Sequence, residues 1–198
     1  MPIGQTNSYA LTQIEFLTDE SLIDLLADWN VPVTTAEKYL KQLKIYDRKA
    51  GAHFLTLGME NEDEGYELRN LYVSDYLGTR DISFIRGHQV KPSNIHVFFD
   101  MRDFLAVVSR YPQERFVDDA IILHSMSLLQ MVPPYLYQYN YRHLYSWMEN
   151  NHNGRMARSK LNAFCAAEPC LSHQPQNTRY AKYETIRDYY RSISQPTP

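Results

Sequence analysis

Ile95-His96-Val97-Phe98-Phe99 is an apolar run that ends at an acidic residue, Asp100, and leads into a helical pattern over 102–110. Two further strand-and-helix units follow, at 120–125 with 127–139 and at 144–148 with 155–167. Apolar strands of this kind suit burial on both faces, and repeated strand–helix units indicate a mostly parallel sheet flanked by helices. With a short strand at 171–172 and a helix over 180–192, the sequence predicts an α/β domain over 91–198.

Residues 1–90 predict a smaller α+β lobe. Two helical patterns, at 22–29 and 36–43, are separated by 31–35; Asp19 or Ser21 is suited to cap the first helix, and Thr34 or Thr35 the second. From residue 53 the apolar period changes to two, and an acidic turn at 60–65 separates two strand patterns, which is typical of a β-hairpin. A third strand is expected over 81–86.

Composition narrows the class of protein. With 198 residues, 44% of them apolar, the chain is able to bury a sizeable core. No run of about 18 apolar residues is present, and residues 1–6 do not resemble a secretion signal, so we expect a cytoplasmic protein with no membrane partner. The two cysteines, Cys165 and Cys170, lack the spacing of a structural zinc site and are expected to be reduced thiols.

Charge is distributed unevenly along the chain. Residues 1–75 hold 6 basic and 13 acidic residues, a net charge of −7, whereas residues 76–198 hold 14 and 10, a net charge of +4. A polyanion should therefore meet the second part of the chain. The 16 tyrosines, several of them within 135–141, favour either half-buried packing or a surface for a partner.

Three segments carry a resemblance to a known family. Gly65-Tyr66-Glu67-Leu68-Arg69-Asn70, Ile121-Ile122-Leu123-His124-Ser125 and Glu149-Asn150-Asn151-His152-Asn153-Gly154 are similar to segments of the primase-like Toprim proteins of Bacteroidetes mobile elements, in which "GGYELRN" precedes the Toprim domain. The resemblance implies a divergent Toprim-like domain that follows an N-terminal lobe. The zinc-binding module usual in that family has no counterpart among these residues.

The resemblance also implies where metal-binding acids should stand. The glutamate that ends the family's first Toprim strand aligns with Phe99, and the acidic pair of the later loop aligns with Glu149 and Asn151; Asp103 matches an outer acid. Mg²⁺ prefers carboxylate oxygens, so these replacements predict a degenerate active site that holds no cofactor. If a residual site survives, its catalytic residues are Asp100 and Glu149, and Asp100, Glu149 and Asn151 hold the Mg²⁺.

Basic residues near the same strand ends are candidate nucleic-acid contacts, because functional side chains gather where parallel strands end. They are His124 after the second strand, and Arg155, Arg158 and Lys160 in the helix that follows the Glu149 loop. Arg69, which alternates with Glu67 on one face of the hairpin, is a further candidate, with an exposed Glu67–Arg69 ion pair as the alternative. A hydrogen-bonded histidine, a solvated helix face and a first-turn Asp103 facing solvent are the structural alternatives.

These observations predict a catalytically degenerate Toprim-like protein that binds DNA or RNA, or a replication or mobilisation protein. One alternative is a Mg²⁺-dependent DNA primase or nuclease that uses the residual acids. The other is a protein-interaction module that uses the tyrosine-rich surface.

Overall fold

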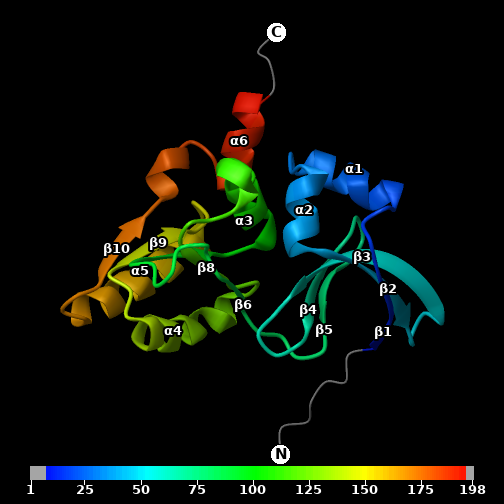
Figure 1. Cartoon of the computed structure of the whole chain (residues 1–198), viewed down its shortest axis with the longest axis horizontal. Helices are drawn as coiled ribbons and strands as arrows, with labels where there is room; N and C mark the ends of the chain where they lie inside the picture. Colours follow the sequence, from blue (N-terminus) through cyan, green and yellow to red (C-terminus); the bar gives the residue numbers. More distant parts are fainter. Residues whose placement is uncertain (1–7, 195–198) are drawn as a thin grey trace, which may run out of the picture. The chain divides into compact units, whose positions relative to one another are not determined.

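The computed structural model describes residues 8–194, and the chain divides by its contacts into two units, Met1–Asp81 and Ile82–Pro198 (Figure 1). Residues 1–6, which do not resemble a secretion signal in sequence, lie outside the described residues. Within the described range no helix has the combined length and apolar character needed to cross a membrane.

The first unit is built on an antiparallel five-stranded sheet in the order β1-β2-β3-β4-β5. Its strands are β1 (Tyr9–Glu15), β2 (Lys41–Asp47), β3 (Ala52–Glu60), β4 (Tyr66–Arg69) and β5 (Ser74–Leu77). Two helices, α1 (Glu20–Asp28) and α2 (Val33–Tyr39), connect β1 to β2. The predicted hairpin is confirmed, because β3 and β4 pair antiparallel with Glu60 opposite Tyr66.

The helices of this unit agree with the sequence prediction in part. Asp19 caps α1, accepting a hydrogen bond from the backbone N–H of Leu22 at 3.1 Å, as predicted. The cap predicted for the second helix is wrong, since Pro32 precedes α2 and no side chain in the described part of the chain caps it. Leu43, predicted to be helical, lies in β2, where it and Ile45 are buried on the same face of the sheet.

The tight turn of the hairpin accounts for Gly65. Asn61 Oδ1 accepts hydrogen bonds from the backbone N–H groups of Asp63 and Gly65, and Asn61 Nδ2 donates to the Thr79 carbonyl. A Cβ on Gly65 would lie 2.4 Å from that Thr79 oxygen, so a larger residue would push the turn away from the segment that contains Thr79.

The second unit contains a mixed five-stranded sheet in the order β10-β9-β7-β8-β6. Its strands are β6 (Ser83–Ile85), β7 (Asn94–Phe98), β8 (Asp119–Ile122), β9 (His143–Trp147) and β10 (Ser172–Pro175). Neighbouring pairs among β10, β9, β7 and β8 are parallel, as the strand–helix repeats predict, and β6 is antiparallel to β8. The strand expected over 81–86, assigned from the sequence to the N-terminal lobe, is therefore an edge strand of this sheet.

Four α-helices belong to the described part of this unit: α3 (Met101–Val108), α4 (Val132–Tyr139), α5 (His152–Ala167) and α6 (Ile186–Ser194). Three short 3-10 helices, Pro112–Glu114, Met126–Met131 and Asn177–Tyr180, lie in the connections. The helix expected over 127–139 is thus a 3-10 turn followed by α4, and the helix expected from 180 begins at Ile186.

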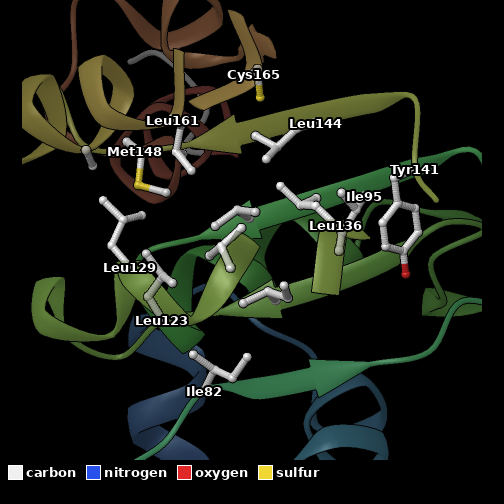
Figure 2. Packing of buried hydrophobic residues seen from close by; sticks show 14 residues of the cluster. Ile82, Ile95, Leu123, Leu129, Leu136, Tyr141, Leu144, Met148, Leu161 and Cys165 are labelled. Atoms are coloured by element: carbon white, nitrogen blue, oxygen red, sulfur yellow. The ribbon is translucent and has the colours of Figure 1, made fainter. Parts of the chain in front are cut away.

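The core of the second unit follows the alternation of β7. Ile95 and Val97 point into a cluster shared with α4 and α5. His96 and Phe98 point to the opposite face, where Phe98 packs edge-on against Phe104 of α3 with the ring centroids 5.5 Å apart. Cys165, in the first cluster, and Cys170 are free thiols, as predicted. Figure 2 labels ten residues of that cluster: Ile82, Ile95, Leu123, Leu129, Leu136, Tyr141, Leu144, Met148, Leu161 and Cys165.

Candidate functional site at the carboxyl ends of the parallel strands

The register of the second sheet brings three strand ends together. Phe98 of β7 pairs with Ile122 of β8 on one side and with Trp147 of β9 on the other. The segments that begin at Phe99, Leu123 and Met148 consequently leave the sheet at one edge, the place where open α/β sheets carry their functional groups.

Asp100 is held by arginine. It caps α3, accepting a hydrogen bond from the backbone N–H of Arg102, and its two carboxylate oxygens accept from Nε and Nη2 of the same Arg102, each at 2.8 Å. Nη1 of Arg187, from α6, lies 4.0 Å from Asp100 Oδ1. Asp100 is only 6% exposed, so both guanidinium groups act on it with little screening by water.

Asp103 is a deeply buried acid of this edge. The sequence alternative of a solvent-facing residue is wrong, because Asp103 is 2% exposed, and its Oδ1 has no hydrogen-bond partner among the described residues. Burial raises the pKa of Asp103 to about 7; the charges of Asp100 and Glu149 act in the same direction, and those of Arg187 and Arg102 oppose them. Asp103 is thus close to a balance between its neutral and charged forms at neutral pH.

Asn151 replaces an acid with a hydrogen-bond donor. Its Oδ1 caps α5 by accepting from the Gly154 N–H, while its Nδ2 donates to Glu149 Oε2 at 2.5 Å and to Glu184 Oε1 at 2.9 Å. The amide therefore offsets part of the repulsion between two carboxylates. Gly154 is required here, since a Cβ at this position would lie 1.9 Å from the Glu149 carbonyl oxygen.

Asn150, which the sequence reasoning did not single out, fixes the loop between β10 and α6. Its Nδ2 donates to the carbonyls of Asn177, Tyr180 and Tyr183, and its Oδ1 accepts from Asn177 Nδ2. Tyr180 also donates its hydroxyl to the Met148 carbonyl at 2.9 Å. These bonds hold the segment that leads to α6, and only the asparagine-rich run after Glu149 hinted at them.

The basic candidates of α5 differ in their surroundings. Arg155 and Lys160 are exposed, whereas Arg158 is partly buried and donates from Nη1 to the Met148 and Glu149 carbonyls at 3.2 and 2.7 Å. Arg158 therefore secures the end of β9. Arg155 and Lys160 remain available at the surface of the helix.

His124 and Arg69 are each held by contacts of their own. His124, at the end of β8, is 6% exposed and has a positive φ of 58°, with its Nε2 2.8 Å from Ser83 Oγ. Arg69 belongs to the first unit, where its Nη2 lies 3.2 Å from Glu67 Oε1, so the predicted ion pair is confirmed. That pair is buried rather than exposed, because Glu67 is 1% exposed and also binds Arg80 Nη2 at 3.0 Å.

The residues at the strand ends do not fit a Mg²⁺ ion in this arrangement. Both oxygens of Asp100 bind a guanidinium, and Asn151 turns its amide N–H₂ toward Glu149, where a ligand would have to offer oxygen. Among residues 8–194, no group of three or more His, Cys, Asp or Glu side chains has the geometry to hold a metal ion.

Comparisons with known proteins give the fold. The structure is similar to the crystal structure of the primase fragment of the bacteriophage T7 primase-helicase protein, with a TM-score of 0.57 and 13% sequence identity over 85% of this chain and 69% of that chain. The chain therefore has a primase-like fold.

A second similar structure, with a TM-score of 0.49 and 14% identity, comes from the bacteriophage T7 lagging-strand DNA polymerase interacting with primase domains of two gp4 subunits bound to an RNA/DNA hybrid and dTTP; it covers 85% of this chain and 87% of that chain. A family model described as a domain of unknown function, DUF8464, matches residues 11–78. No curated protein matches the chain.

Proposed function

We propose that this chain is a catalytically degenerate, Toprim-like protein that binds nucleic acid, alone or with a replication or mobilisation protein. One observation carries the claim that the site is degenerate: the carboxylate of Asp100 is occupied on both oxygens by Arg102, with Arg187 of α6 4.0 Å away. The primase-like fold is retained, and Arg102 and Arg187 neutralise the charge of Asp100 at the end of β7.

The argument rests on competition for the same oxygens. A bidentate, charge-assisted Arg–carboxylate pair is among the stronger polar contacts in proteins. A Mg²⁺ ion would have to displace Arg102 from Asp100 and to find its remaining ligands beside an Asn151 amide that donates to Glu149. Neither change is favourable, because Mg²⁺ demands near-ideal geometry from oxygen ligands.

Binding of a polyanion is a separate matter from cleavage. Arg155 and Lys160 are exposed on α5, which begins beside the Glu149 loop, and the second part of the chain carries the net positive charge. Phosphate contacts by such side chains position a strand without reading its sequence. We assign Arg155 and Lys160 this role, while Arg158 holds the strand end.

The test measures affinity for single-stranded DNA and RNA against salt concentration. We expect log K to fall linearly with log [salt], and Arg155→Gln with Lys160→Gln to reduce the slope by about 1.4, since each phosphate that is no longer neutralised on a single strand accounts for about 0.7. Lys182→Gln, a change at another exposed lysine of the same unit, is the matched control and should leave the slope unchanged. Wild-type protein that binds neither nucleic acid at low salt would refute the proposal.

A Mg²⁺-dependent primase or nuclease is the second candidate, favoured by the proximity of three carboxylates, since Asp100 and Glu149 both raise the pKa of Asp103. Calorimetric titration with Mg²⁺ and Mn²⁺ separates the two candidates. Metal binding that disappears in Glu149→Gln, together with metal-dependent primer synthesis or cleavage that disappears in Asp100→Asn, would establish the enzyme.

A further inference from the structure

A stacked cluster of aromatic rings lies under one exposed arginine of the second unit. None of its residues belongs to the candidate site around Asp100 and Glu149. Phe84 of the edge strand β6 stacks on Tyr139 of α4, with ring centroids 5.5 Å apart and an interplanar angle of 14°, and Tyr135 packs 4.8 Å from Phe84. The guanidinium carbon of Arg86 lies 4.0 Å from the Tyr139 ring centroid and 4.7 Å from that of Phe84.

Arg86 is fixed in this position by a buried carboxylate. Its Nη1 lies 3.1 Å from Oδ2 of Asp119, whose side chain is 1% exposed. Asp119 is itself oriented by hydrogen bonds from the Gly87 N–H, at 2.8 Å, and from the Tyr141 hydroxyl. Because a Cβ on Gly87 would lie 2.2 Å from the Val117 carbonyl oxygen, the chain beside Arg86 depends on glycine to approach this closely.

The outward face of this guanidinium remains accessible. The Arg86 side chain is 54% exposed although the two rings lie beneath it and Asp119 lies at its edge. A planar cation that is already held against aromatic rings loses little conformational entropy when another flat group stacks on it. The cluster of Phe84, Arg86, Tyr135 and Tyr139 thus forms a preorganised stacking platform.

Charge indicates what this platform binds. The positive charge of Arg86 is balanced by Asp119 at 3.1 Å, so a phosphate group would gain less here than at an unbalanced arginine. A nucleobase needs no net charge, since every base has a π-face that stacks on aromatic rings and on guanidinium planes.

We propose that the stacking platform of Phe84, Arg86, Tyr135 and Tyr139 binds an unpaired base of a single-stranded nucleic acid. The inference rests on the proposed function, and it adds a base-binding surface at the β6 edge to the phosphate contacts of α5. It predicts a preference for single strands, because bases in a duplex are not available to stack on a side chain.

The experiment compares two probes on three proteins. A short single-stranded oligothymidylate and an abasic oligomer of the same length are titrated by fluorescence anisotropy into wild type, Arg86→Lys and Arg115→Lys. Lysine keeps the charge and is able to pair with Asp119, but it has no plane. Arg115 is an exposed arginine of the same unit, so Arg115→Lys is the matched control. The Arg115→Lys protein should bind both probes as wild type does.

We expect Arg86→Lys to bind oligothymidylate between about five-fold and about 150-fold more weakly, the range for loss of one stacked base, and to bind the abasic oligomer as wild type does. A 5-iodouracil oligomer should photocross-link to wild-type Tyr139 or Tyr135, which tests the geometry without any variant. If wild type binds oligothymidylate and Arg86→Lys binds it equally well, the platform is refuted and the proposed function stands. If wild type binds neither these oligomers nor single-stranded RNA at low salt, both fail.

Discussion

Replacing Asp103 with asparagine should remove a pH-dependent loss of stability from the second unit. Asp103 is 2% exposed, its Oδ1 has no hydrogen-bond partner among residues 8–194, and burial raises its pKa to about 7 from an ordinary value of 3.8. Between these two pH values the folded chain keeps a proton that the unfolded chain releases. The free energy of unfolding therefore falls as pH rises through this window.

The size of the effect follows from the separation of the two pKa values. A shift of one pKa unit corresponds to 1.36 kcal/mol, so a shift of about three units amounts to about 4 kcal/mol. This contribution to the free energy of unfolding is fully present below pH 3.8 and is lost once the pH has passed 7. Asparagine cannot ionise and is nearly isosteric. Asp103→Asn should match wild type near pH 4 and exceed its stability by about 4 kcal/mol at pH 8.

The two tryptophans allow the second unit to be followed alone. Trp29 lies in the first unit and Trp147 in the second, and both are buried. In a Trp29→Phe background, urea unfolding would be monitored by Trp147 fluorescence from pH 4 to pH 8. The two proteins compared in this background differ only by the Asp103→Asn change.

The difference between the two curves isolates Asp103. His173, whose pKa burial lowers to about 4, contributes the opposite slope, because stability is lost as pH falls from 6.5 toward that value; this contribution is common to both proteins. Parallel curves across the whole range would refute the reasoning and would mean that Arg187 and Arg102 keep Asp103 ionised in the fold.

Two further predictions concern the Glu149 loop. Asn151→Asp replaces the donor between Glu149 and Glu184 with a third carboxylate, so we expect the free energy of unfolding to fall by about 1–3 kcal/mol, without recovery in MgCl₂; recovery would indicate a metal site. Gly154→Ala places a Cβ 1.9 Å from the Glu149 carbonyl oxygen and should cost about 3 kcal/mol. Gly51→Ala should cost about 1 kcal/mol, because φ there is 67° and no atom of the described residues lies within 4 Å of the added Cβ. Equal losses in the two alanine variants, measured by urea unfolding, would contradict the close approach.

Local pattern was sufficient for much of the fold. Asp19 caps α1, the β3–β4 hairpin turns at the acidic segment, and the strand–helix repeats form parallel strands. Apolar spacing and helix caps act over a few residues, so the sequence was sufficient to predict these features. Leu43 shows the limit. Its spacing from Ala36, Tyr39 and Leu40 suits a helix, but its alternation with Ile45 suits the strand it forms, and only pairing with β3 decides between them.

The sequence was sufficient to predict where the candidate site lies, whereas the contacts and burial of its side chains were decided by the tertiary structure. The sequence by itself placed Asp100, Glu149 and Asn151 after parallel strands, because such strands end at one edge of their sheet. Only the folded chain brought Arg187 from α6 to Asp100, buried Asp103, and set Arg86 on Tyr139. Contacts between residues this far apart in the chain depend on how whole elements pack, and no local pattern records that packing.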